Sequence, residues 1–345
     1  MGSSTPSAYD SSVSLVRLTG MVCILLCHLF SWIGIAALSQ LFNVGVPLFL
    51  LISGFLYGGK TVKLRSFLAN RYLRVTLPVG IFILFLSVYL YSFARESASF
   101  GTIPLYMLNL QGLSFLCGYI PYRELCGGTG HLWFITVLML CYLLMLAFKQ
   151  IENRLYPTGK TLLLTLIVSC AAVALLCMVK LYVSYLQIFF IGYACKKHAW
   201  KSRFKPWLLW TGLMIAAVGV RLLLVLRGMD GAEWYLSVVA LQQNMLAFWI
   251  FATFRLVYAR CPAQFDAIAQ NKLIRHSDTL SFYVYIVHYM FLVKPFDVSQ
   301  LGIGRMCEFV VFAIATVVCA EALRAVTILA QKAIRLPVRK TSAQA

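Results

Sequence analysis

Charged residues are scarce in this chain, and acidic ones are the scarcest. Only 12% of the 345 residues are charged, with 11 acidic against 30 basic side chains, whereas 61% are hydrophobic. An average soluble domain carries about 25% charged residues. This composition, with a mean hydropathy of +0.83, excludes an ordinary soluble domain and predicts a polytopic membrane protein.

The spacings typical of metal sites and disulfide frameworks are also missing. Neither a CxxC nor an HExxH pattern occurs, so the sequence gives no support for a bound metal. Most of the 11 cysteines lie within apolar runs, where cysteine acts as a small hydrophobic residue. Cys117 and Cys126 share one polar-flanked loop and could pair if that loop faces an oxidising compartment.

Apolar runs of membrane-spanning length recur along the chain. A helix needs about 20 mostly apolar residues to cross the hydrocarbon core. The runs predicted to cross are 13–37, 42–58, 72–93, 131–149, 161–178, 180–195, 206–226, 234–259, 280–295 and 305–330. We therefore expect an all-α polytopic protein of about ten transmembrane helices. A polar tail over 1–12 and a basic tail over 332–345 would flank a membrane domain over 13–331.

The basic residues indicate how these runs are oriented. When the loops are assigned alternately to the two sides, 23 of the 30 lysines and arginines fall on one side. Cytoplasmic loops carry such an excess, so both termini are predicted to be cytoplasmic. The formal charge of +19 then reflects topology and contact with anionic membrane lipids, and nucleic-acid binding becomes a poor explanation.

The first apolar run holds an arginine and a histidine that point to function. Arg17 and His28 are eleven positions apart, which in a helix brings them to nearly the same face, about 16 Å apart along the axis. A titratable residue inside the membrane is costly and is by default a functional candidate. The alternative is that His28 only forms a hydrogen bond to a neighbouring helix.

Two further regions could contact ligands. Arg71 and Arg74, at positions i and i+3 before the third run, could hold a phosphate or a carboxylate, or anchor to anionic lipid head groups. The segment from 94 to 130 contains a semi-apolar stretch over 103–120, and its length predicts a re-entrant or interfacial element that covers a cavity.

Polar residues in the later runs have both structural and functional interpretations. Trp133 fits an interfacial aromatic belt as well as sugar stacking. His288 could line a cavity or form a hydrogen bond between helices, and the second is favoured slightly. Glu321 lies one turn from Arg324, so an intrahelical ion pair is its ordinary explanation, and a role in activating His28 is the less favoured one.

Five collinear segments resemble the membrane-bound acyltransferase-3 family, whose members acylate sugars of surface polysaccharides. They are LVRLTGMVCILLCHLF with Arg17 and His28, NVGVPLFLLISGFLYGGK with Gly45, Ser53 and Gly54, FLANRYLRVTLP with Phe67, Arg71, Arg74 and Pro78, GHLWFITVLMLCYLL with His131, Trp133 and Tyr142, and LSFYVYIVHYMF with Ser281, Tyr285 and His288. The chain departs from the family pattern at Leu48, where an aromatic residue is common.

The resemblance implies an O-acyltransferase whose helices surround a central polar tunnel in the plasma (inner) membrane. Acyl-CoA, with acetyl-CoA as the expected donor, would enter from the cytoplasm, and a glycan or lipid-linked sugar would approach from the other face. Together, the resemblance and the residues themselves give these candidates: His28 and Glu321 for catalysis, Arg17, Arg71 and Arg74 for the donor, and Ser53, His131, Trp133, Tyr285 and His288 for the acceptor.

Several alternatives remain open at the level of sequence. His28 could remove the proton of the sugar hydroxyl, or it could carry the acyl group as an acyl-imidazole. The same helices and the intramembrane histidine could instead form the path of a small-molecule transporter. The protein could also be a non-catalytic partner in a glycan-assembly complex, and a homo-oligomer remains open.

Overall fold

A computed structural model describes most of the chain. The described residues are 10–58, 60, 64–94, 103–117, 128–155, 159–229, 231–232 and 234–341. They fall into two compact units, which we treat separately. The first unit comprises Met1–Cys27, Ala37–Gly59 and Ile151–Ser281, and the second comprises His28–Ala36, Lys60–Gln150 and Phe282–Ala345.

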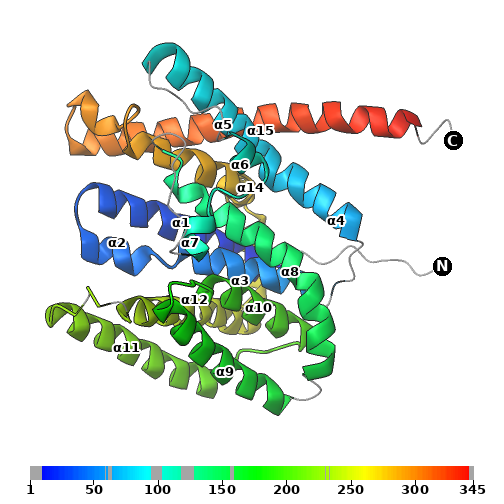
Figure 1. The fold of residues 1–345 in the computed structure, drawn as a ribbon, viewed down its shortest axis with the longest axis vertical. Helices are drawn as coiled ribbons and strands as arrows, with labels where there is room; N and C mark the ends of the chain where they lie inside the picture. The colour runs from blue at the N-terminus through cyan, green and yellow to red at the C-terminus, as the bar shows by residue number, and fades with distance from the viewer. Residues whose placement is uncertain are drawn as a thin grey trace. The chain divides into compact units, whose positions relative to one another are not determined.

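The described chain is helical in each of the ten predicted apolar runs, as Figure 1 shows. The α-helices are α1 Ser11–Trp32, α2 Ala36–Phe42, α3 Gly45–Tyr57, α4 Leu64–Arg71, α5 Leu77–Tyr89, α6 Ile103–Met107, α7 Leu113–Leu116, α8 Trp133–Leu155, α9 Gly159–Met178, α10 Ser184–Lys197, α11 Phe204–Leu226, α12 Tyr235–Arg260, α13 Pro262–Gln270, α14 Lys272–Val287 and α15 Arg305–Thr341. Two π-helical turns, η1 Tyr72–Thr76 and η2 Leu90–Ala94, flank α5, and the 3-10 helices are η4 Gly130–Leu132, η5 His288–Leu292 and η6 Val298–Leu301.

Six helical stretches in the described part are long and apolar enough to cross a membrane. They are Ser11–Trp32, Ala36–Tyr57, Ser66–Phe93, Phe204–Leu226, Tyr235–Arg260 and Arg305–Ile334, and shorter apolar helices cover Gly130–Met145 and Ser169–Met178. The chain is therefore an all-α membrane protein, as its composition predicted. The number of ten spans and the orientation of the termini stay predictions.

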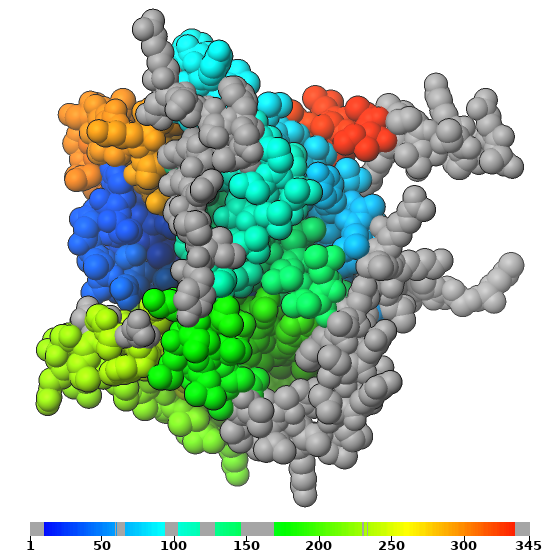
Figure 2. All heavy atoms as spheres, in the orientation of Figure 1, coloured from blue at the N-terminus to red at the C-terminus, as the bar shows by residue number. Residues whose placement is uncertain are grey.

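The first unit is built on close contact between α3 and α10. A Cβ atom added at Gly54 would lie 1.8 Å from the carbonyl oxygen of Phe189, and one at Gly192 would lie 2.0 Å from that of Leu51. Small residues let membrane helices approach at the backbone, where packing and weak polar contacts replace the hydrophobic effect. Helix α11 is much less buried than α3 or α10: every residue of it is described, and Arg221 is the one that is buried. Figure 2 shows part of α11 at the surface of the molecule.

In the second unit, residues 103–117 of the predicted interfacial segment pack against the start of α8. It contains the short helices α6 and α7, and the Gly112 amide donates to the Thr136 hydroxyl at 2.9 Å. The buried side-chain amide of Asn109 donates to the Thr76 hydroxyl at 2.9 Å. These bonds satisfy polar groups where a bend leaves the chain without helical hydrogen bonds. Cys126, proposed to pair with Cys117, lies outside the described residues.

Candidate active site

Three histidines from distant parts of the sequence come together in the second unit. The ring centroids of His28 and His288 are 5.2 Å apart, those of His131 and His288 are 5.0 Å apart, and those of His28 and His131 are 6.4 Å apart. His28 comes from α1, His131 from η4 and His288 from the start of η5. We call this group the histidine cluster.

The end of α14 holds two of the three imidazoles in place. The carbonyls in the last turn of an α-helix lack intrahelical partners, and here they face histidine nitrogens. Nε2 of His131 lies 2.8 Å from the Tyr285 oxygen and 3.1 Å from the Ile286 oxygen, while Nδ1 of His288 lies 2.8 Å from the same Tyr285 oxygen. A carbonyl can only accept, so both of these nitrogens carry hydrogen and donate.

The remaining nitrogens of these two rings are therefore acceptors when the rings are neutral. Nδ1 of His131 and Nε2 of His288 are buried, and neither has a hydrogen-bond partner among the described residues. His131 is 4% exposed and His288 is fully buried, whereas His28 is half-buried. Buried polar atoms are nearly always satisfied, so these two acceptors beside a more accessible imidazole make the cluster a candidate ligand site.

Two tyrosines, Tyr285 and Tyr289, contact the histidine cluster. The Tyr285 hydroxyl donates to the backbone oxygen of His131, so these two residues hold each other reciprocally. The ring of Tyr289 lies 4.8 Å from that of His28 and 5.2 Å from that of His131, measured between centroids. Sequence analysis included Tyr285 but missed Tyr289, whose only signal was its place directly after His288.

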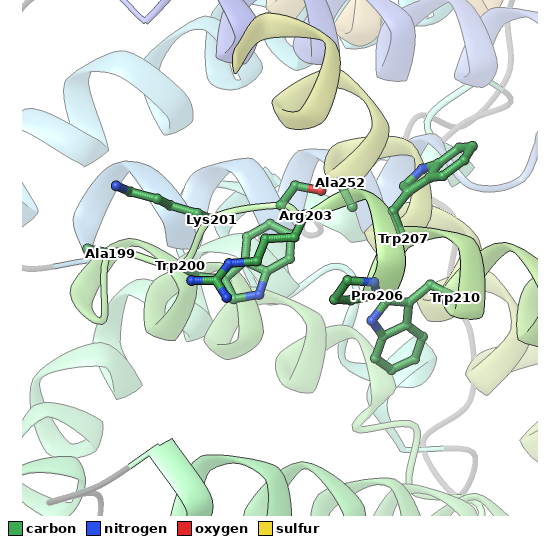
Figure 3. Close-up of a pocket in the computed structure, with 9 residues that line it drawn as sticks. Ala199, Trp200, Lys201, Arg203, Pro206, Trp207, Trp210 and Ala252 are labelled. Carbon is green, nitrogen blue, oxygen red and sulfur yellow. The ribbon is translucent and has the colours of Figure 1, made fainter. Parts of the chain in front are cut away.

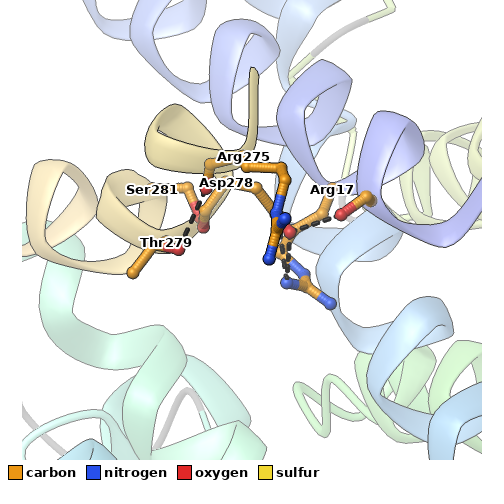
Figure 4. A network of polar contacts seen from close by, with 6 residues as sticks. Arg17, Arg275, Asp278, Thr279 and Ser281 are labelled. Carbon is orange, nitrogen blue, oxygen red and sulfur yellow. Dashed lines mark hydrogen bonds and ion pairs between the residues drawn. The ribbon is translucent and has the colours of Figure 1, made fainter. Parts of the chain in front are cut away.

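Arg17 belongs to the first unit and is bound by an aspartate that sequence analysis did not single out. Its Nη1 lies 3.0 and 3.1 Å from the two carboxylate oxygens of Asp278, to which Ser14 also donates a hydrogen bond (Figure 4). The Ser281 hydroxyl donates to the Asp278 carbonyl oxygen at 2.8 Å. Asp278 is 10% exposed, so in this structure the charge of Arg17 is balanced by a largely buried carboxylate.

The predicted donor arginines Arg71 and Arg74 lie in the second unit in different environments. Arg71 is half-buried, with its guanidinium 5.7 Å from the ring centroid of Phe67 and 5.6 Å from that of Tyr142. Arg74 is exposed and lies in the π-helical turn η1. Because a π-helical turn is wider than an α-helical one, positions i and i+3 do not align here as they would in a regular α-helix.

The other predicted site residues have the following places. Trp133 stacks on Phe115 of the interfacial segment, with centroids 5.1 Å apart and planes inclined by 21°. Ser53 is half-buried on α3, in the first unit. Arg324 Nε donates to the Glu321 carboxylate at 2.8 Å, which confirms the ion pair expected from their spacing.

The histidine cluster lies in an all-α membrane protein. The family model described as "Acyltransferase domain" matches residues 10–324 of the chain. The chain therefore belongs to the acyltransferase-3 family and is an acyltransferase, as the five sequence segments indicated. No curated protein and no solved structure is significantly similar to it.

Proposed function

We propose that the protein transfers an acyl group, most simply acetyl, from cytoplasmic acyl-CoA to a hydroxyl of an extracytoplasmic or lipid-linked glycan, and that it does so in the plasma (inner) membrane. The observation that carries this proposal is the histidine cluster in a member of an acyltransferase family. A hydroxyl attacks a thioester only when its proton is removed, and an imidazole is well suited to that task near neutral pH.

His28 is the proposed catalytic base because it is the accessible member of the cluster. Its ring accepts the hydroxyl proton as the oxygen attacks the thioester carbonyl carbon. The tetrahedral intermediate then collapses, the carbon–sulfur bond breaks, and the thiolate of coenzyme A takes the proton from the imidazolium. The ester and the free thiol are the products, and His28 returns to its neutral form.

The two buried histidines, His131 and His288, stabilise the positive charge that His28 acquires in this step. Their donor nitrogens are bonded to carbonyls of α14, so Nδ1 of His131 and Nε2 of His288 are acceptors. We assign to them a hydrogen bond from the His28 imidazolium. Such acceptors stabilise an imidazolium through a charge-assisted hydrogen bond, which is stronger than one between neutral groups. Tyr289, in ring contact with His28, limits the orientations that this imidazole can adopt.

The placement of the substrates follows from charge. The basic loops predict that acyl-CoA arrives from the cytoplasmic side, where Arg17, Arg71 and Arg74 would meet its phosphates. The acceptor would enter a polar tunnel from the opposite face. There the interfacial segment, with Phe115 stacked on Trp133, offers aromatic surface to a sugar ring.

Acyl transfer is best tested on the purified protein with radiolabelled acetyl-CoA and a panel of glycans and lipid-linked sugars. We expect labelled ester and free coenzyme A from the wild type, and a loss of at least a hundredfold in His28→Ala, the lower end of the usual contribution of a general base. Cys27→Ala serves as the matched control, because Cys27 adjoins His28 on α1 and its thiol contacts Ser39 at 3.6 Å. It should retain normal turnover.

Three results would contradict parts of this proposal. Wild-type protein that releases no coenzyme A with any acceptor, while proteoliposomes accumulate a solute, would indicate transport instead. Normal glycan acetylation in cells that carry His28→Ala would indicate a non-catalytic partner. Label that stays on the denatured wild-type protein, but not on His28→Ala, would replace the general-base step by an acyl-imidazole intermediate.

A further inference from the structure

A cavity of about 500 Å³ lies in the first unit, where the connection between α10 and α11 meets α12 (Figure 3). Its size falls within the range of about 300–1,000 Å³ that is usual for small-molecule sites. The residues that line it are Ala199, Trp200, Lys201, Ser202, Arg203, Pro206, Trp207, Trp210 and Ala252. The lining thus combines three indoles with two cations.

The indoles are held by contacts outside the cavity. Trp207 donates from Nε1 to the Thr253 hydroxyl at 2.8 Å. Trp200 lies nearly parallel to Phe251, with centroids 6.3 Å apart, and Trp210 meets Phe248 edge-on at 5.6 Å. Side chains fixed in this way lose little conformational entropy when a flat ligand binds against them.

The cavity is positively charged. Lys201 and Arg203 are exposed, and within the described part of the chain neither forms an ion pair or a hydrogen bond. The lining itself contains no acidic side chain. The positive-inside rule predicts the same segment to be cytoplasmic. A phosphate group on a cytoplasmic ligand would therefore find two available cations here, and guanidinium groups bind phosphates well.

We infer that this cavity binds the nucleotide end of acyl-CoA, with the purine against the indoles and the ribose phosphate on Lys201 and Arg203. The identity of this ligand rests on the proposed function. An anionic lipid head group would use the two cations but offers no flat ring to the three indoles, whereas a nucleotide matches both kinds of lining.

Binding can be measured without turnover. Full-length protein in phosphatidylcholine nanodiscs is equilibrated with radiolabelled coenzyme A or with dephospho-coenzyme A, which lacks the ribose phosphate. We expect the Lys201→Ala/Arg203→Ala double variant to bind coenzyme A about tenfold more weakly, the equivalent of one charge-assisted hydrogen bond. Its affinity for dephospho-coenzyme A should match that of the wild type. Lys205→Ala, which removes an exposed cation outside the lining, is the control and should bind like the wild type.

Unchanged coenzyme A affinity in the double variant would overturn the inference. So would a variant that loses only phosphatidylglycerol, measured as lipid retained on purification, because the cavity would then be a lipid head-group site. His28→Ala separates this inference from the proposed function, since it should bind coenzyme A normally. Nucleotide binding without acyl transfer by the wild type would refute the function alone, and acyl transfer with unaltered affinity in the double variant would refute the cavity's role alone.

Discussion

The ion pair between Arg17 and Asp278 allows a quantitative test of the structure. The charged atoms are 3.0 Å apart, and the side chains are 31% and 10% exposed. Two unit charges at that distance attract by about 5 kcal/mol at an effective dielectric constant near 20. Desolvation and residual exposure reduce the net value, so we expect a coupling energy of about 1–2 kcal/mol. A double-mutant cycle with Arg17→Gln and Asp278→Asn, followed by unfolding in mixed micelles, measures it.

The pair formed by Arg324 and Glu321 is the internal control for this cycle. Its distance is similar, at 2.8 Å, but its side chains are 30% and 31% exposed and one turn apart on a single helix. Exposed pairs of this kind contribute about 0.3–0.5 kcal/mol. Equal coupling energies in the two cycles would refute the argument that burial of Asp278 makes its ion pair the stronger one.

Two further predictions concern packing and the histidine cluster. Gly54→Ala should lower thermal stability by at least the 1–3 kcal/mol typical of overpacking, because its Cβ would meet the Phe189 carbonyl, whereas Gly212→Ala, with no atom within 4 Å, should be neutral or slightly stabilising in the same melting assay. Tyr285→Phe should lower kcat about tenfold with KM unchanged, because the His131 backbone oxygen loses its buried donor while the hydrogen bonds from the histidine rings to the α14 carbonyls remain. An unchanged kcat would show that Tyr285 does not support the histidine cluster in catalysis.

The helical architecture could be predicted well from the sequence because each membrane helix is a contiguous apolar run. Each of the ten apolar runs contains helix in the described chain, and charged ends extend some of them, as in α15. The limits were wrong at two places: run 13–37 crosses the break between α1 and α2, and run 280–295 passes the end of α14 at Val287. The close approach of α3 and α10 could not be predicted. The family segment includes Gly54. Its close approach to the Phe189 carbonyl, however, depends on a partner about 135 positions away in the sequence. Pairing of that kind leaves no periodic signal.

The individual residues of the candidate site were predicted from the sequence, but their proximity in space was not. His28, His131 and His288 each stand out as a titratable group in an apolar run, and nothing in their spacing indicates that they meet. Asp278 did carry a signal, since only 11 acidic residues occur in the chain and this one lies two positions before an apolar run. Its partner Arg17 was instead assigned to the acyl donor.

The end of α14 at Val287 supports the different roles proposed for the three histidines. The Tyr285 carbonyl, at the end of α14, accepts hydrogen bonds from both His131 and His288. This carbonyl and its neighbours at Val284 and Ile286 therefore set the donor nitrogen of two buried rings and leave the opposite nitrogen of each as an acceptor. Each of these rings has one nitrogen bonded to α14 and is buried, so it can stabilise a positive charge nearby but is poorly placed to contact the substrates itself. His28 is the half-buried member with ring contacts to both, so the proton of the acceptor hydroxyl should pass through His28.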